Sequence, residues 1–230
     1  MIDIAFKATL RKDVIEKTLK TFRTIFFVEE PCHLVGNVDN VGVDTFDEVM
    51  EIINYYFPDN DVTLTLEPHS GLAYYNILRR CKADIVLMLE DDWELMTFAN
   101  WSFLMNIFDK NPDLQALRFM VAGFRELHGG ELIQRDGWCE IPPDNKFWQL
   151  TTRPTLFRGS FIKKIMKTFD GTLNLEKWMI ANDELKEGGR FGLCPDIIVR
   201  DIGRAWRQQH GYHKGAHDKN GGFTQWIKTV

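Results

Sequence analysis

Strand-like and helix-like segments alternate through residues 1–95, and this alternation is the strongest constraint on the fold. Apolar residues at every second position predict strands over residues 2–9, 33–38 and 62–66, and apolar residues at helical spacing lie between them. Residues 84–89 (DIVLML) are apolar enough to predict a strand that is buried on both faces. The pattern predicts an α/β fold: an open, mostly parallel, doubly wound sheet with helices on both faces.

Capping residues set the expected starts of the helices in this half. Asp13 and Glu16 are spaced as a capping box, and Thr45 and Glu48 open the next helix. Ser70 is the expected cap of a third helix, which runs to about residue 82.

The second half of the chain is less regular. Thr97 is the expected cap of a further helix, and Asn174 is the expected cap of another. The remaining expectations are a strand over 114–121, a hairpin and loops over 124–150, helices over 158–169 and 174–187, and a strand over 197–202.

Composition excludes several classes of protein. The formal net charge of −5 argues against a nucleic-acid binder, which needs a basic face. The four cysteines, Cys32, Cys81, Cys139 and Cys194, form no CxxC pair, which argues against a zinc site or a disulfide framework. No signal peptide is recognisable, and no apolar run approaches the roughly 20 residues of a membrane span. We therefore expect a cytoplasmic protein without a transmembrane segment.

Polar residues follow the predicted strands. Ligands of open α/β sheets bind outside the carboxyl ends of the strands. The residues at those ends are Thr9-Leu10-Arg11, Asp39-Asn40, Glu67-Pro68-His69 and Glu90-Asp91-Asp92.

The three successive acids Glu90, Asp91 and Asp92 are the most informative of these groups. Carboxylates this close repel one another and raise one another's pKa unless a cation lies among them. Mg²⁺ or Mn²⁺, which take oxygen ligands, would relieve the repulsion and could bridge a diphosphate. The alternative is a solvated acidic turn at the end of a strand.

Residues 71–76 (GLAYYN) and 83–92 (ADIVLMLEDD) resemble the central signature of GT-A-fold glycosyltransferases, especially the family-2-like group. That signature has a Gly, a helix with an Asn, here Asn76, and an apolar strand that ends in an Asp-x-Asp motif, here Glu90-Asp91-Asp92. The resemblance implies a nucleotide-sugar donor, Asp92 as metal ligand, and Glu90 as a contact to ribose or metal. Glu90 replaces the first Asp of the motif, which leaves its role open.

The resemblance extends upstream. It implies that Thr9 and Arg11 cradle the nucleotide, with Asp91 and Arg79 as further donor contacts, and that Asp39 binds the uracil. A carboxylate can accept the N3–H of uracil, which favours UDP or dTDP donors. Asp39 could instead be a turn residue, and Arg11 and Arg79 could be solvated helix residues.

The acceptor site and general base are implied for the second half. Residues 153–159 resemble the strand-to-helix passage that lines the acceptor site. In inverting members an acidic pair on a helix removes the acceptor's proton, which implies Asp183, with Glu184 as second choice. The alternative is a charged helix face. Trp138, Phe147 and Trp148 could stack on an acceptor sugar or pack beneath a loop.

The C-terminal segment is basic in an acidic protein. A segment that folds over the donor is common in GT-A enzymes, which implies diphosphate contacts from Arg204 and Lys214 and a metal contact from His210 or His213. A flexible basic tail is the alternative.

We therefore expect one GT-A-like domain over residues 1–230. Residues 1–110 form its nucleotide-sugar-binding half, residues 111–199 an irregular acceptor half, and residues 200–230 a closing segment. The expected activity is metal-dependent transfer of a sugar, with inversion, from a nucleotide-diphosphate sugar to a hydroxyl of a carbohydrate or glycan acceptor, with Mn²⁺ or Mg²⁺ as cofactor. The alternatives are a sugar-phosphate nucleotidyltransferase, which usually has a Gly-rich loop that residues 8–12 lack, and a non-catalytic binding module.

Overall fold

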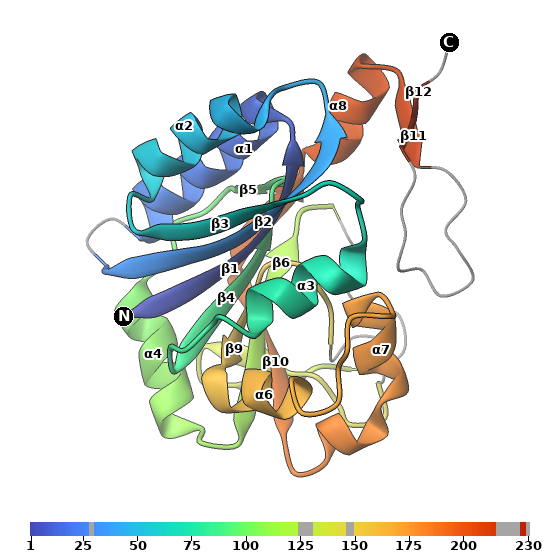
Figure 1. The fold of residues 1–230 in the computed structure, drawn as a ribbon. Helices are drawn as coiled ribbons and strands as arrows, with labels where there is room; N and C mark the ends of the chain where they lie inside the picture. Colours follow the sequence, from blue (N-terminus) through green and yellow to red (C-terminus); the bar gives the residue numbers. More distant parts are fainter. Residues whose placement is uncertain (28–29, 124–130, 146–149, 215–225, 229–230) are drawn as a thin grey trace.

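The computed structural model describes residues 1–27, 30–123, 131–145, 150–214 and 226–228 (Figure 1). The strands are β1 (Ile2–Leu10), β2 (Cys32–Gly42), β3 (Asn60–Thr65), β4 (Ile85–Glu90), β5 (Trp93–Leu95), β6 (Leu114–Val121), β7 (Ile133–Arg135), β8 (Trp138–Glu140), β9 (Thr155–Arg158), β10 (Arg190–Asp201), β11 (Tyr212–Lys214) and β12 (Trp226–Lys228). The helices are α1 (Lys12–Thr21), α2 (Phe46–Tyr56), α3 (Ser70–Leu78), α4 (Trp101–Lys110), α6 (Gly159–Ile165), α7 (Leu175–Ala181) and α8 (Gly203–Gln209), with a π-helical turn η1 (Phe22–Phe26) and a 3₁₀ turn η2 (Asp183–Lys186).

The described strands form one large sheet and one small hairpin. The order in the large sheet is β3-β2-β1-β4-β9-β6-β10-β8-β7, with β5 paired to β10. Strands β3, β2, β1 and β4 are parallel neighbours, and β6 is parallel to β10. Strand β9 is antiparallel to both of its neighbours, β4 and β6. The prediction of an α/β fold with a large, mostly parallel sheet is confirmed.

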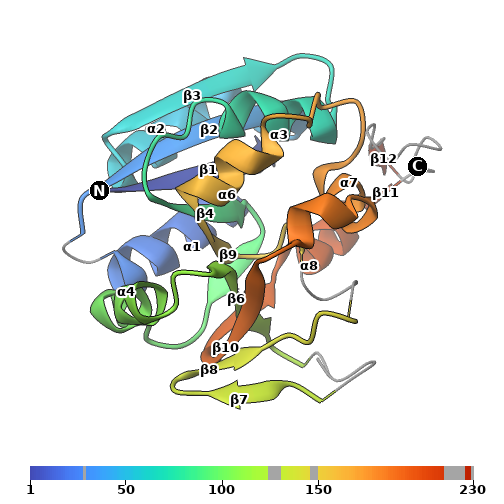
Figure 2. The same ribbon diagram turned by 90° about the horizontal axis from the view of Figure 1, so that it is seen from below.

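Helices cover both faces of the sheet (Figures 1 and 2). One apolar cluster joins α1, α2 and α4 to one face, through residues such as Ile15, Ile53 and Leu104. A second cluster joins α3, α6 and α7 to the other face, through residues such as Ile77 and Phe161. Each sheet face is therefore buried beneath its own helix layer, as expected for a mostly parallel sheet.

Helix caps agree only in part with the sequence-based expectation. The Thr45–Glu48 capping box is present, and Asn174 caps α7. Asp13 is not a cap, because α1 begins one residue before it, after Arg11. The side chain of His69, not that of Ser70, caps α3.

The expected cap of α4 also differs. Asn100 caps this helix, with its side chain accepting a hydrogen bond from the backbone N–H of Phe103 at 3.0 Å. Thr97 instead donates to the carbonyl of Asp196 and accepts from the backbone N–H of Ile198, which ties it to β10.

Three features of the second half differ from the prediction. Strand β10 is twelve residues long and begins at Arg190, well before the expected residue 197. The predicted helices over 158–169 and 174–187 are shorter than expected, as α6 and α7 each have seven residues. Helix α8 was not expected, because one short helix has too few residues to show a periodicity.

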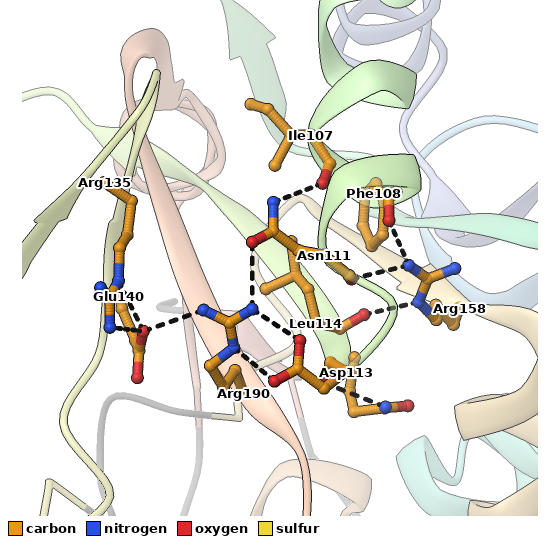
Figure 3. A network of polar contacts seen from close by, with 10 residues as sticks. Ile107, Phe108, Asn111, Asp113, Leu114, Arg135, Glu140, Arg158 and Arg190 are labelled. Atoms are coloured by element: carbon orange, nitrogen blue, oxygen red, sulfur yellow. Dashed lines mark hydrogen bonds and ion pairs between the residues drawn. The ribbon is translucent and has the colours of Figure 1, made fainter.

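A polar network joins the starts of β6 and β10 (Figure 3). The guanidinium of Arg190 bonds to both oxygens of Asp113, at 2.6 and 2.7 Å, and to Asn111 Oδ1 at 3.0 Å. Arg158 donates to the backbone carbonyls of Phe108, Asn111 and Leu114. These contacts bind the end of α4 to the amino edge of the sheet.

No helix in the described part of the chain is both long and apolar enough to cross a bilayer.

Candidate active site at the carboxyl edge of the sheet

The sheet face beneath α3 changes from apolar to polar along its strands. Ala5, Val35 and Met88 lie in the apolar core on this face. Two residues further along β1, β2 and β4, the same face carries polar residues that are neighbours in the strand register. The first row is Thr63, Asn37, Lys7 and Glu90, and the next is Thr65, Asp39 and Thr9. The change of polarity places a candidate ligand site at the carboxyl edge, as expected for an open α/β sheet.

Asp91 is bonded to the turn that follows β1. Its Oδ2 accepts hydrogen bonds from the backbone N–H and the hydroxyl of Thr9, both at 2.9 Å. Its Oδ1 lies 2.6 Å from Nη2 of Arg11, whose Nε donates to the Thr9 hydroxyl at 2.6 Å. Thr9, Arg11 and Asp91 are 6%, 1% and 3% exposed. The structure therefore brings these three predicted residues together, and it shows them bonded to one another.

Glu90 lies on the α3 side of the site. Its Oε1 accepts a hydrogen bond of 2.7 Å from the hydroxyl of Tyr74, a buried residue of α3. Burial raises the pKa of Tyr74 well above its ordinary value, and the charges of Glu90 and Glu176 raise it further. Tyr74 therefore stays protonated and keeps donating to Glu90.

Asp92 is half-buried, with 18% of its side chain accessible. Burial raises its pKa to about 6, and the neighbouring charges of Asp91 and Glu90 add to the shift. Arg11 acts in the opposite direction from 3.5 Å. A Cβ at Gly203, the first residue of α8, would lie 2.2 Å from Asp92 Oδ2, so only glycine allows this approach.

The acidic trio is thus stabilised partly by the protein itself. The sequence predicted that one divalent cation, bound among all three acids, would relieve their mutual repulsion. In the structure Arg11 and Thr9 neutralise and bond Asp91, and Tyr74 bonds Glu90. Burial, and after it the charges of Asp91 and Glu90, raise the pKa of Asp92 in spite of the nearby Arg11.

The donor set suits a cation that is held jointly with a substrate. The described residues contain no group of three or more His, Cys, Asp or Glu side chains arranged to hold a metal ion. Mg²⁺, however, is usually bound by one or two carboxylates together with substrate phosphates and water, not by a complete protein cage. Asp92, crowded by like charge and still partly accessible, fits that role.

Asp39 lies near the end of β2, with both carboxylate oxygens engaged. Asn37 Nδ2 donates to Oδ1 at 3.1 Å, and Nζ of Lys7 lies 3.7 Å from Oδ2. Burial raises the pKa of Asp39, while the charge of Lys7 lowers it. The residue is held in the row next to Thr9, within the group that the sequence placed at the strand ends.

The structure does not bring Arg79 to this group. Arg79 follows α3 at its far end and lines a cavity with Asp3, His33 and Asp61, which lie at or near the starts of β1, β2 and β3. Asn76 lies one turn before Arg80, to which its carbonyl is bonded at 2.9 Å, on the same far half of α3.

Asp183 and Glu184 lie in η2, beyond the end of α7. Asp183 is ion-paired with Lys186 at 3.1 Å, and 65% of its side chain is accessible. Glu184 is also exposed. The start of α7, by contrast, is docked on the start of α3: Asn174 bonds to Ser70, and a Cβ at Gly71 would meet the carbonyl of Leu173 at 2.2 Å.

Glu176, in the first turn of α7, was missed by the sequence-based prediction. It is half-buried and close enough to Tyr74 for its charge to raise the pKa of that residue. The signal was available, because Asn174 was recognised as a helix cap and Glu176 follows it by two residues.

Helix α8 packs against the acidic residues. The centre of the Trp206 ring lies 5.4 Å from the guanidinium carbon of Arg11. Trp206 also stacks with His210 and with Tyr212, at ring-centre distances of 4.2 and 5.7 Å. The Nδ1 of His210 lies 3.0 Å from the carbonyl of Trp206.

The other predicted residues of the C-terminal segment are only partly described. Arg204 is an exposed residue of α8. His213 and Lys214 belong to β11, but their side chains lie outside the described part of the chain.

The aromatic residues predicted for acceptor stacking are not gathered at this edge in the described part of the chain. Trp138 is buried in β8, with the guanidinium of Arg190 at 5.5 Å from its ring. Phe147 and Trp148 lie outside the described residues.

Comparison with known proteins gives a fold match without a sequence match. No protein-family model and no curated protein matches the sequence. Among solved structures, the chain is similar to S. aureus TarS (TM-score 0.65, 14% identity, covering 87% of this chain and 36% of TarS). It is also similar to S. aureus TarS 1-349 in complex with UDP-GlcNAc, with a TM-score of 0.56 and 13% identity. That match covers 87% of this chain and 58% of the other.

A further similar structure is the mannosyltransferase PcManGT from Pyrobaculum calidifontis in complex with GDP-Man and Mn²⁺, with a TM-score of 0.53 and 13% identity. That match covers 90% of this chain and 59% of the other. This chain spans less than two thirds of the length of each of these three structures. The similarity in architecture covers nearly the whole chain, and it shows that the chain has the fold of the GT-A-type glycosyltransferases.

Proposed function

We propose that this protein is a metal-dependent glycosyltransferase that uses a nucleotide-diphosphate sugar, with a UDP-sugar favoured. The observation that carries the proposal is the grouping of Asp39, Glu90 and Asp92 with Thr9 and Arg11 at the carboxyl edge of the sheet. The fold supports it, since the similar solved structures carry UDP-GlcNAc or GDP-Man with Mn²⁺.

In this proposal each group has a separate task. Asp39 accepts a hydrogen bond from the base, and Asp92 holds Mn²⁺ or Mg²⁺ together with the diphosphate. When bound, the cation stabilises the negative charge that develops on the leaving diphosphate. Arg11 and Thr9 hold Asp91, and thereby fix the turn that carries Asp92. A carbohydrate or glycan hydroxyl is the acceptor.

The experiment that tests the donor class is a calorimetric titration. UDP, GDP and dTDP are titrated into the protein with Mn²⁺ and with EDTA. We expect UDP to bind in the presence of Mn²⁺ and to lose most of its affinity in EDTA. Equal affinity with and without metal would contradict the assignment of Asp92. Release of pyrophosphate from UTP and a sugar phosphate would favour a nucleotidyltransferase instead.

For the general base we propose Glu176 in place of the sequence-based assignment to Asp183. A base must reach the acceptor hydroxyl beside the donor. Glu176 lies in the helix turn docked beside α3 and near Tyr74, which is bonded to Glu90. Asp183 follows the far end of α7, where its partner is Lys186. An α-helix rises about 1.5 Å per residue, so the length of α7 separates the two carboxylates by roughly 10 Å.

Two isosteric variants distinguish these assignments. Glu176→Gln is expected to lower the rate of sugar transfer by a factor of about 10² to 10⁴, the usual contribution of a general base, without changing UDP affinity. Asp183→Asn is the matched control and is expected to keep most of the activity. The reverse result would restore Asp183, with Glu184→Gln as the next variant. Inversion is checked by the anomeric configuration of the product.

A further inference from the structure

Lys7 is a buried cation that the proposed function leaves without a role. It lies in the middle of β1, between Asn37 of β2 and Glu90 of β4 in the register. Its side chain is 16% exposed, and its Nζ lies 5.9 Å from the centre of the Tyr74 ring. The preceding residue of β1 on this face is Ala5, which packs in the apolar core. A lysine at the rim of an apolar core is costly to bury and calls for a specific partner.

Asp39 is that partner. The Nζ of Lys7 lies 3.7 Å from Asp39 Oδ2, and Asn37 Nδ2 lies 3.1 Å from Oδ1, so the two donors approach the carboxylate on different oxygens. Asn37 is itself held, because its Oδ1 accepts hydrogen bonds from Thr65 at 2.8 Å and Thr63 at 3.3 Å. The plane of the Asp39 carboxylate is therefore fixed from both sides by groups on the sheet.

We propose that Lys7 is a positioning residue that keeps Asp39 a charged acceptor and thereby sets the preference for the donor's base. The inference rests on the proposed function, in which Asp39 contacts the base. An ionised carboxylate only accepts hydrogen bonds, and uracil offers it an N3–H. Cytosine has an unprotonated ring nitrogen at that position, which would face the carboxylate without a proton between them.

The preference for uracil over cytosine arises because the ring nitrogen of cytosine would offer the Asp39 carboxylate no hydrogen-bond donor. A buried site built to receive a hydrogen bond rejects a ligand that cannot supply it, because the site's polar group is left unsatisfied. Lys7 strengthens this rejection, since its charge opposes protonation of Asp39, and a protonated Asp39 could donate to cytosine. Removing the charge of Lys7 is thus expected to reduce the discrimination between the two bases more than it reduces binding as such.

The test is a calorimetric comparison of UMP and CMP, which lack the metal-bridged diphosphate. Parent protein, Lys7→Met and Lys7→Gln are titrated with each nucleotide. Lys17→Met is the matched control, because Lys17 lies at the surface of α1, paired with Glu94 at 3.3 Å. We expect the parent and the control to bind UMP more tightly than CMP. In both Lys7 variants the ratio of UMP affinity to CMP affinity is expected to fall about tenfold, the effect of one charge-assisted hydrogen bond.

The outcomes separate the two proposals. An unchanged ratio of UMP to CMP affinity in folded Lys7→Met or Lys7→Gln overturns the role of Lys7, and so does a parent that binds both nucleotides equally. Neither result touches metal-dependent UDP binding by the parent, on which the proposed function depends. Since Lys7→Gln keeps a donor toward Asp39, it supplies the measurement if Lys7→Met fails to unfold cooperatively.

Discussion

The two edges of the sheet both carry arginines among acids, but they balance charge in opposite ways. At the amino edge Arg190 meets Asp113 and Glu140, and Arg158 donates to backbone carbonyls (Figure 3). These cations are fully engaged in joining α4, β6 and β10.

In the described part of the carboxyl edge, the group around Asp92 holds more carboxylates than cations. Asp39, Glu90, Asp91 and Asp92 share Lys7 and Arg11. Burial alone would lower the pKa of Lys7, yet the surrounding carboxylates raise it. The comparison indicates that the amino edge is a structural network, whereas the described group at the carboxyl edge holds an excess of negative charge that a bound cation would offset.

The largest effect is expected where the carboxyl edge is itself structural. Arg11→Met leaves Asp91 buried without its cation, and breaking a buried ion pair in this way costs about 3–5 kcal/mol. Urea unfolding measures the change. The double variant Arg11→Met/Asp91→Asn removes both charges and is expected to recover about half of the loss. Loss below 1 kcal/mol in the single variant would contradict a structural role for this pair.

The charge of Asp92, unlike that of Arg11, is expected to destabilise the folded protein when no metal is bound. Its pKa of about 6 in the folded protein lies above the ordinary value of 3.8, so the folded state keeps a proton that the unfolded state has lost between those pH values. The free energy of unfolding therefore falls as pH rises from about 4 to 6, and Asp92 contributes an unfavourable term at neutral pH.

Removing this charge should stabilise the protein without metal. Asp92→Asn is expected to raise the free energy of unfolding by about 2 kcal/mol at pH 7.5 in EDTA, and by close to nothing at pH 3.5. The same variant should lose Mn²⁺-dependent UDP binding. Denaturation at the two pH values, with calorimetry for UDP, measures both effects. An equal change in the free energy of unfolding at both pH values would contradict the unfavourable contribution assigned to the Asp92 charge.

The smallest effect is expected at the amino edge. Arg190→Gln removes ion pairs to Asp113 and Glu140 that are partly exposed, so the cost in unfolding free energy is about 1 kcal/mol. UDP affinity is expected to stay unchanged, because Arg190 lies at the start of β10, at the edge of the sheet opposite the candidate site. A change in UDP affinity without a loss of stability would show that the two edges are coupled. It would contradict the conclusion that the amino edge has only a structural role.

Much of the nucleotide half was predictable because its signals are local. Strands β1 to β3 follow from apolar alternation, β4 follows from its continuous apolar run, and the start of α2 follows from the spacing of Thr45 and Glu48. The clustering of Thr9, Arg11, Asp39 and the acidic trio followed from one rule, that the carboxyl ends of parallel strands share an edge.

The second half was less predictable because its order depends on distant partners. Strand β9 is too short to show its antiparallel place between β4 and β6. Helix α8 has seven residues and is held by Trp206 against Arg11 and by Gly203 against Asp92. The choice between Glu176 and Asp183 depends on how α7 docks on α3, which no local pattern records.

The sequence by itself determined that an apolar strand ends in three acids at the ligand-binding edge of an α/β sheet, since strand period and composition are local properties of the chain. Only the tertiary structure decided what each acid does. Asp91 faces Thr9 and Arg11, Glu90 faces Tyr74, and Asp92 is the carboxylate whose pKa is raised by burial and by the charges of its neighbours. The physical reason is that the charge state and the partners of a buried carboxylate depend on groups brought from other strands and helices.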